Sequence, residues 1–437
     1  MQVSADWRLS LSIPIAYLLV PIASEVSTIS PAAGVDLRDR LRRYAFVAAF
    51  VSSVGQLVSI FVAHTALAAA CVGLVASRER TRMPPVATPL VGFVSWTLLS
   101  LAFSDDPAAG WPQVRKLLVF LTLPVVYSLF RTMSQVQRLL EALFVAMLAS
   151  SLTALGQIAW KASEAYASGQ SFYYSYVGRR ITGFFSHWMT FSQVLMLVAL
   201  LLASYLLFSR KQRWRGRGVW LGVGALLGVV LLLSYTRSTW AAALAGGAYL
   251  VWHWKPRLLW IAPIGFVLLM GIAPEPVRQR LKSVGDPDSY SNRLLMWQTG
   301  MRMVEAHPWF GVGPERVRER FDDFQPAGAG ERPPGYYAHL HNVVIHYAAE
   351  RGIPATIFIL WFLLAVFRDH ASAARGKIRA VHRLSWLPHG VAASTVGLLV
   401  AGLFDQSLGD SEILGAYLVS VALGYRIIAL GKQENAS

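Results

Sequence analysis

Long uninterrupted apolar runs constrain this chain more than any other feature of its sequence. Three clear examples are residues 188–208, 219–235 and 258–272. Each approaches the roughly 20 residues that a helix needs to cross a hydrocarbon layer about 30 Å thick. The run at 219–235 alternates Gly, Val and Leu without a polar stripe, as expected of a helix surrounded by lipid or by other helices. The sequence therefore predicts an all-α integral membrane protein.

The composition supports this prediction and limits the partners. Charged residues make up 15% of the 437 residues and hydrophobic residues 55%, whereas about a quarter of a soluble domain is charged. A net charge of +16 is also typical of nucleic-acid binding, but in a membrane protein it reflects Lys and Arg retained in cytoplasmic loops and beside anionic headgroups. We therefore expect membrane lipids as partners and no nucleic acid.

Short basic connections predict the orientation, because Lys and Arg are retained on the cytoplasmic side. About twelve spans with both ends inside are expected, and thirteen is the alternative, because residues 44–77 could form one tilted span or a tight pair. Residues 9–23 are read as a first anchored span. The basic connections are 77–82, 209–218, 253–257 and 368–383, and the other expected spans are 87–103, 115–130, 138–160, 188–208, 219–235, 239–252, 258–272, 342–367, 386–404 and 411–430.

This topology divides the chain into three parts, namely transmembrane helices over 1–272, a large periplasmic loop over 273–341 and C-terminal transmembrane helices over 342–437. Within the loop, Ser291 or Asn292 is expected to cap a helix. This helix would run to about residue 305 and lie along the membrane surface on an apolar stripe. The stripe consists of Leu294, Trp297, Met301 and Val304. The Gly/Pro-rich segment 324–337 is predicted to be a flexible loop at the membrane mouth.

Arginines on the predicted outer face form three candidate clusters. Arg179 and Arg180 precede a span, Arg237 lies in a short turn between two apolar spans, and Arg293 follows the expected helix cap. Arg237 breaks the positive-inside trend. Arg293 near a helix N-terminus opposes the helix dipole unless an anion also binds there. Several arginines can grip a diphosphate through charge-assisted hydrogen bonds.

Histidines form the fourth cluster, where the loop re-enters the membrane. His339, His341 and Asn342 are followed by His346 and Glu350. On a helix, 339, 342, 346 and 350 share one stripe, whereas an extended segment would put 339 and 341 on one face. A neutral imidazole can accept a proton from a hydroxyl group near ambient pH. Zinc is the alternative, but the chain lacks the HExxH and CxxC ligand patterns, so we predict neither a metal nor a cofactor.

These motifs resemble the O-antigen ligase family and its wider ligase–polymerase superfamily. His341-Asn342, nine residues and Gly352-Ile353-Pro354-Ala355-Thr356 match the family's His-Asn, spacer and Gly-x-x-Gly-Thr pattern, except that Ala355 replaces the usual Gly. Ser234–Ser238 looks like the family's Thr-Arg-Ser turn. The segment from Arg180 to His187 resembles its Arg/Gly/His segment, and the segment from Arg293 through Trp297 to Gly313 resembles the start of its large loop.

The resemblance implies a fold similar to the family C glycosyltransferases and a metal-independent, inverting transfer of O-antigen. The donor would be undecaprenyl-diphosphate-linked O-antigen and the acceptor the lipid A-core, at the periplasmic face of the bacterial inner membrane. Arg180, Arg237 and Arg293 would bind the diphosphate, and His339 or His341 would activate the acceptor hydroxyl. Arg179, His187, Asn342 and Trp297 are secondary candidates.

Three other activities remain open at this stage. An O-antigen polymerase would use a second lipid-linked chain as acceptor, and a protein O-oligosaccharyltransferase would use a Ser or Thr. An anion transporter would bind substrate at buried arginines near the midplane, usually between repeated halves. Here the polar residues gather at one face and in one loop, which favours an enzyme at the membrane interface.

Overall fold

The computed structural model describes residues 36–209, 214–261, 271, 275–282, 288–328, 339–376 and 384–434. Within these residues every regular element is helical and no strand occurs, which confirms the all-α prediction. The expected span at 9–23, most of that at 258–272 and most of the 324–337 loop lie outside the described residues.

The first half of the chain supplies one side of a helical bundle. Its helices are α2 (Leu37–Gly55), α3 (Ile60–Ala76), α4 (Ala87–Ala102), α5 (Trp111–Leu117), η1 (Leu118–Leu121), α6 (Thr122–Leu129), α7 (Met133–Ala167), α8 (Phe172–Gly178) and α9 (Trp188–Phe208). Helix α9 has the bounds predicted from its apolar run. Residues 44–77 form a pair of helices rather than one tilted span, and α2 and α3 pack against each other along small residues such as Gly55 and Ala63.

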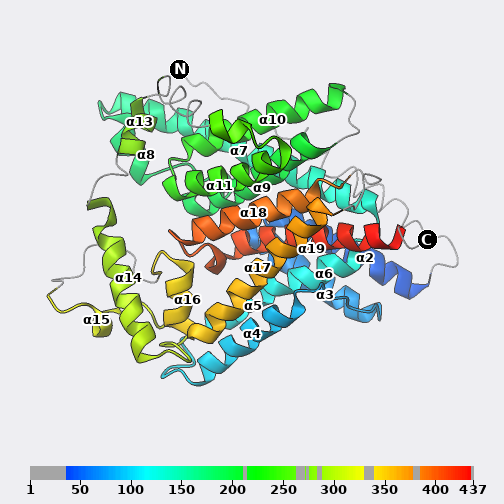
Figure 1. Cartoon of the computed structure of the whole chain (residues 1–437), viewed down its shortest axis with the longest axis horizontal. Coiled ribbons are helices and arrows are strands. Elements are labelled where there is room, and N and C mark those ends of the chain that lie inside the picture. The colour runs from blue at the N-terminus through cyan, green and yellow to red at the C-terminus, as the bar shows by residue number, and fades with distance from the viewer. Residues whose placement is uncertain are drawn as a thin grey trace, which may run out of the picture.

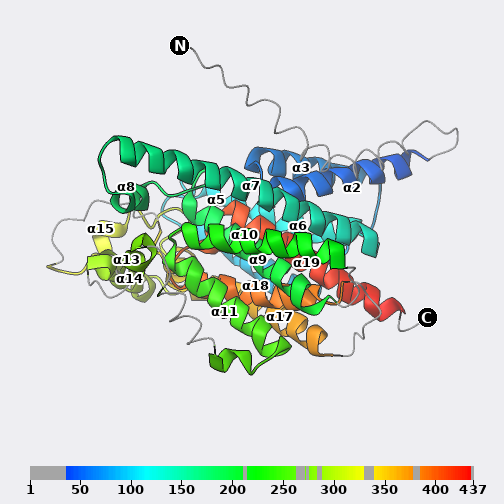
Figure 2. The ribbon, with the colours of Figure 1, turned by 90° about the horizontal axis from the view of Figure 1, so that it is seen from above.

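The second half completes the bundle and carries the loop helices. Its elements are α10 (Trp214–Leu233), α11 (Arg237–Trp254), α13 (Glu275–Lys282), α14 (Asp288–Ala306), α15 (Phe321–Phe324), α16 (Val343–Arg351), α17 (Ile353–Arg375), α18 (Leu387–Gly402), η3 (Ser407–Gly409) and α19 (Ser411–Glu434). Both views place α8, α13, α14 and α15 at one end of the bundle, opposite the C-terminus (Figures 1 and 2). We call this the loop end.

Four of the described helices, α7, α9, α17 and α19, are long and apolar enough to cross a membrane. The helices α3, α4 and α18, and the part of α10 from Arg217 to Leu233, are apolar but shorter. A membrane protein is thereby supported, but the expected number of twelve spans is not confirmed. Two expected spans are interrupted. Residues 115–130 divide into α5, η1 and α6, and residues 342–367 divide into α16 and α17 at Gly352, whose φ is +87°.

The loop helix differs from its prediction in two respects. Helix α14 begins at Asp288, three residues before the expected cap, so Arg293 lies in its second turn. Its buried apolar side chains are Met296 and Met303, which form a small core with Leu340 from the segment before α16. Of the predicted stripe, Trp297 and Val304 pack against this core, whereas Leu294 and Met301 are exposed.

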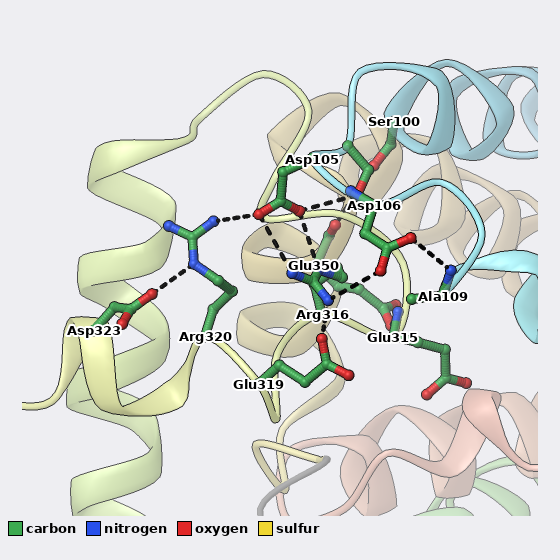
Figure 3. Close-up of polar contacts among 11 residues, drawn as sticks. Ser100, Asp105, Asp106, Ala109, Glu315, Arg316, Glu319, Arg320, Asp323 and Glu350 are labelled. Carbon is green, nitrogen blue, oxygen red and sulfur yellow. Dashed lines mark hydrogen bonds and ion pairs between the residues drawn. The ribbon is translucent and has the colours of Figure 1, made fainter.

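An ion-pair network ties the loop to the bundle (Figure 3). Arg316 and Arg320, which follow α14, both bind the carboxylate of Asp105 in the α4–α5 connection, with N–O distances of 3.0 Å. Arg316 also contacts Asp106 at 3.7 Å. The Arg316 hydrogen bond is the main cause that lowers the pKa of Asp105. The loop is therefore fixed against the bundle on the side of α4.

Candidate functional site

A cleft of about 880 Å³ opens at the loop end of the bundle and joins segments that are distant in sequence. Residues from several parts of the chain line it: Ile60 of α3, Lys116 of α5, the segment where α9 begins, the first half of α14, and the segments before α16 and between α18 and α19, together with the first turn of α19. Its polar lining residues are Lys116, Ser186, His187, Thr190, Asn292, Arg293, His339, His341, Asp405, Gln406, Asp410, Ser411 and Glu412. Both predicted catalytic histidines and one predicted arginine thus lie in one cleft.

Asn342 explains how the two histidines are presented. Its side-chain oxygen accepts hydrogen bonds from the backbone N–H groups of Val344 and Ile345 at 2.9 and 3.0 Å, so it caps α16. Its Nδ2 donates to the carbonyl of Leu403 at the end of α18. The helix therefore begins after the histidines, so the helical stripe from 339 to 350, one of the two alternatives that the sequence left open, does not form. Asn342 serves the site by holding this segment rather than by facing the cleft.

His341 lies beside a carboxylate from another part of the chain. Its φ of +48° is a left-handed conformation that is costly for a side chain with a Cβ. Its Nδ1 lies 3.4 Å from Oδ1 of Asp405, and Oδ2 of Asp405 accepts a hydrogen bond from Gln193 Nε2 at 2.7 Å. Asp405 is thus fixed from α9, and it can orient the imidazole so that Nε2 is the atom available to a ligand.

His339 occupies a more enclosed position than His341. Burial lowers the pKa of His339, and the nearby Glu350 and Asp405 carboxylates only partly oppose this effect. Its ring packs edge-on against the ring of His346, with centroids 5.7 Å apart. His339 is therefore neutral at pH 7 and lies between the cleft and the buried face of α16.

The predicted arginines converge, and a fourth arginine joins them. Burial lowers the pKa of Arg180 to about 10, and the positive charges of Arg280, Arg237 and Arg293 act in the same direction. The carbonyl of Tyr235 accepts a hydrogen bond from Arg280 Nε at 3.0 Å and one from Arg180 Nη1 at 3.5 Å. We call these four residues the arginine cluster. Concentrating four cations in a partly dehydrated place is costly and favours an anion.

The turn before α11 fixes part of this cluster. Tyr235, at φ +51°, directs its carbonyl to two arginines, and Arg237 is the first residue of α11. The argument about the helix dipole, made for Arg293 from the sequence, therefore applies to Arg237 instead. Arg180 also stacks on Trp188, 4.9 Å from the ring centroid, and Trp188 lines the cleft. This contact joins the arginine cluster to the cleft.

Three secondary candidates occupy different positions. His187 lines the cleft, and its Nδ1 accepts from the N–H of Met189 to cap α9. Arg179 lies at the surface and pairs with Glu164 at 3.6 Å, with 65% of its side chain exposed. Trp297 packs into the small core of the loop rather than lining the cleft. Of these three candidates, only His187 lines the cleft.

The spacing of the motif that begins at His341 has a structural explanation. Its nine-residue spacer is helix α16, which starts after the cap at Asn342 and ends at Gly352. A Cβ at Gly352 would collide with the carbonyl of Trp309. The methyl of Ala355, which replaces the usual glycine, is fully buried.

Backbone hydrogen bonds fasten the loop to this same helix end. Val312 N donates to Ala349 O at 2.8 Å, and Gly313 N donates to Glu350 O at 3.0 Å. The buried Glu350 carboxylate accepts from the N–H of Glu315 and from Arg351 Nε, both at 2.9 Å. The loop and the histidine segment therefore form one packed unit.

Sequence reasoning missed Arg280, Asp405 and the acidic residues beside it. Arg280 was one of nine basic residues in a loop with no net charge, so nothing marked it. The sequence did contain a signal for the acidic residues. Asp405, Asp410 and Glu412 lie where two expected apolar spans meet on the predicted outer side. Across the described part of the chain, no group of three or more His, Cys, Asp or Glu side chains gathers closely enough to hold a metal ion.

Part of the chain matches a known protein family. Residues 222–360 match the family model described as O-antigen ligase, which confirms the resemblance seen in the motifs. The matched segment includes Arg237, Arg293, His339 and His341, whereas Arg180 and His187 precede it. No curated protein matches the chain. This part of the chain is therefore similar to the O-antigen ligase family, whose members are glycosyltransferase-like enzymes that act on polysaccharide and lipid substrates.

Proposed function

We propose that the protein is an inverting O-antigen ligase of the bacterial inner membrane. It moves O-antigen from undecaprenyl diphosphate to the lipid A-core at the periplasmic face, without a metal ion. One observation carries the proposal. Four arginines lie in and beside the same cleft as His341, whose imidazole lies next to the Asp405 carboxylate. The arginines fit a diphosphate and the histidine fits a hydroxyl group.

The diphosphate is bound by Arg180, Arg237, Arg280 and Arg293. When the bond between the anomeric carbon and the diphosphate oxygen breaks, the electron pair stays on the diphosphate. Preorganised cations stabilise that developing charge more effectively than water does, because they need no reorganisation at the moment of reaction. A diphosphate so stabilised leaves without a general acid.

His341 acts as the base. Its Nδ1 faces Asp405, so Nε2 accepts the proton of the acceptor hydroxyl while the hydroxyl oxygen bonds to the anomeric carbon. The resulting imidazolium is stabilised by the Asp405 carboxylate. Attack from the side opposite to the diphosphate inverts the anomeric centre. His339 is more enclosed and lies beside this base, where it supports the position of His341.

The test is transfer by purified protein in a lipid bilayer, with lipid-linked glycan as donor and lipid A-core as acceptor. His341→Ala should lower turnover by about 10²–10⁴-fold, the range for loss of a general base. Arg237→Ala should lower it by about 10²–10³-fold, as for a lost donor to a developing anion. A chelator should leave turnover unchanged. Near-normal turnover in both variants would refute the proposal.

The chain provides two matched controls. Arg179→Ala removes a neighbouring arginine that pairs with Glu164 at the surface, so it should leave turnover within about twofold, whereas Arg180→Ala should not. His307→Ala removes a loop histidine that packs on Phe324 instead of lining the cleft. The labelled product identifies the acceptor: glycan on longer lipid-linked chains would indicate a polymerase, and glycan on protein would indicate an oligosaccharyltransferase.

A further inference from the structure

The two sides of the cleft differ in charge. Arg293 from α14 lies on one side, and the arginine cluster continues from it. The connection from α18 to α19 and the first turn of α19 contribute Asp405, Gln406, Asp410 and Glu412 to the cleft, and no basic side chain. Lys116 of α5 is the other basic residue that lines the cleft. His341 lies between these sides because its Nδ1 contacts Asp405. A second substrate would therefore meet the base from the acidic side.

Two of the acidic residues already have structural partners. Asp405 accepts from Gln193 and faces His341. Asp410 accepts a hydrogen bond from Thr190 at 2.5 Å, and its other oxygen caps α19 by accepting from the N–H groups of residues 412 and 413. These carboxylates set the negative potential of this side, but their hydrogen-bonding capacity is largely used.

Gln406 is different, because its carboxamide is buried without a partner. Its side chain is 5% exposed, and neither Oε1 nor Nε2 has a hydrogen-bond partner among the residues that the structure describes. Leaving such a group unsatisfied is unfavourable, because it has lost its hydrogen bonds to water. The carboxamide lies against the Cα of Gly409, which lines the cleft and has no side chain to cover it. A buried carboxamide at a cleft wall is suited to a ligand that both donates and accepts hydrogen bonds.

We infer that Gln406 and Glu412 form the acceptor-sugar subsite, which binds a terminal sugar that carries no phosphate or carboxylate. This inference rests on the proposed transfer reaction. Sugar hydroxyls exchange hydrogen bonds in both directions with a carboxamide and with the carboxyl group of Glu412, which is hydrogen-bonded to Asp410. A phosphorylated or carboxylated ring would meet the carboxylates of Asp405 and Asp410 at close range, where like charges repel. The acidic side thus keeps the anionic diphosphate at the arginines and leaves the neutral ring beside His341.

The experiment compares KM values for the two substrates in the reconstituted full-length protein. Gln406→Ala should raise the acceptor KM by about tenfold, the effect of one to two lost hydrogen bonds, and leave the donor KM unchanged. Gln56→Ala is the matched control. Gln56 is also a buried glutamine without a described partner, but it packs against Gly415 and does not line the cleft. It should change neither KM. Gln406→Asn, which keeps a carboxamide, serves if the alanine variant does not fold.

A second experiment does not depend on a folded Gln406 variant. Wild-type protein should use an acceptor that ends in a neutral sugar at least tenfold better than the same acceptor phosphorylated on that sugar. An unchanged acceptor KM in the Gln406 variants, or equal use of both acceptors by wild type, overturns the inference alone. Failure of wild type to transfer glycan to any lipid A-core overturns the proposed function and this inference with it.

Discussion

Glu350 provides the sharpest test of how the loop is held. Its side chain is 2% exposed, and it accepts hydrogen bonds from Arg351 and from the backbone N–H of Glu315, both at 2.9 Å. Glu350→Ala leaves Arg351 buried with one described side-chain hydrogen bond, to Gln113 at 3.0 Å. Breaking a buried pair by removing one partner costs about 3–5 kcal/mol. The orphaned N–H would add about 1–3 kcal/mol if it found no water.

The matched control is Glu319→Ala, which removes a carboxylate from the same loop. Glu319 pairs with Arg316 but is 57% exposed, so its loss should cost about 0–1 kcal/mol. Unfolding by titration with denaturing detergent in mixed micelles would compare the two variants. The double variant Glu350→Leu/Arg351→Met should recover much of the loss, because it removes both buried charges. The reasoning is refuted if Glu350→Ala is within about 1 kcal/mol of Glu319→Ala, or if the double variant is less stable than the single one.

Three further predictions concern other parts of the site. Asp405→Asn should lower kcat by about tenfold or more, yet less than His341→Ala, because it misorients the base without removing it; steady-state kinetics check this, and an unchanged kcat contradicts it. Gly352→Ala should destabilise the protein by about 1–3 kcal/mol, since φ is +87° and the methyl meets Trp309; the same unfolding assay measures it. Burial lowers the pKa of His339. Below about pH 6.5, His339 is therefore protonated more readily in the unfolded chain than in the folded protein, which lowers stability. The melting temperature should therefore fall as pH drops from 7 to 5.5, and less steeply in His339→Gln.

The fold class and much of the arginine cluster could be predicted from sequence because they depend on local patterns. A 21-residue apolar run gave the bounds of α9, and an arginine between apolar helices is conspicuous wherever it occurs. Helix breaks were less accessible. The division at Gly352 depends on the carbonyl of Trp309, 43 positions earlier in the chain, and no local propensity reports such a contact.

The carboxylate beside His341 shows the same limit. The distance between positions 341 and 405 in the sequence spans α16, α17 and α18, so their contact follows from how these helices pack. The sequence also suggested an equivalent role for the two histidines. Only the packing distinguishes His341, which contacts Asp405, from His339, which contacts the ring of His346.

The site draws its groups from several separate parts of the chain, the loop among them, so its geometry depends on how firmly the loop is docked. The Asp105 network is the more visible contact, but Asp105 is 47% exposed, and each exposed pair contributes about 0–1 kcal/mol. The Glu350 contacts are buried, and their loss costs several times more. They also lie in the helix that begins directly after His341 and Asn342. Loop docking and the position of the base therefore rest mainly on this buried carboxylate, and a change there should disturb stability and turnover together.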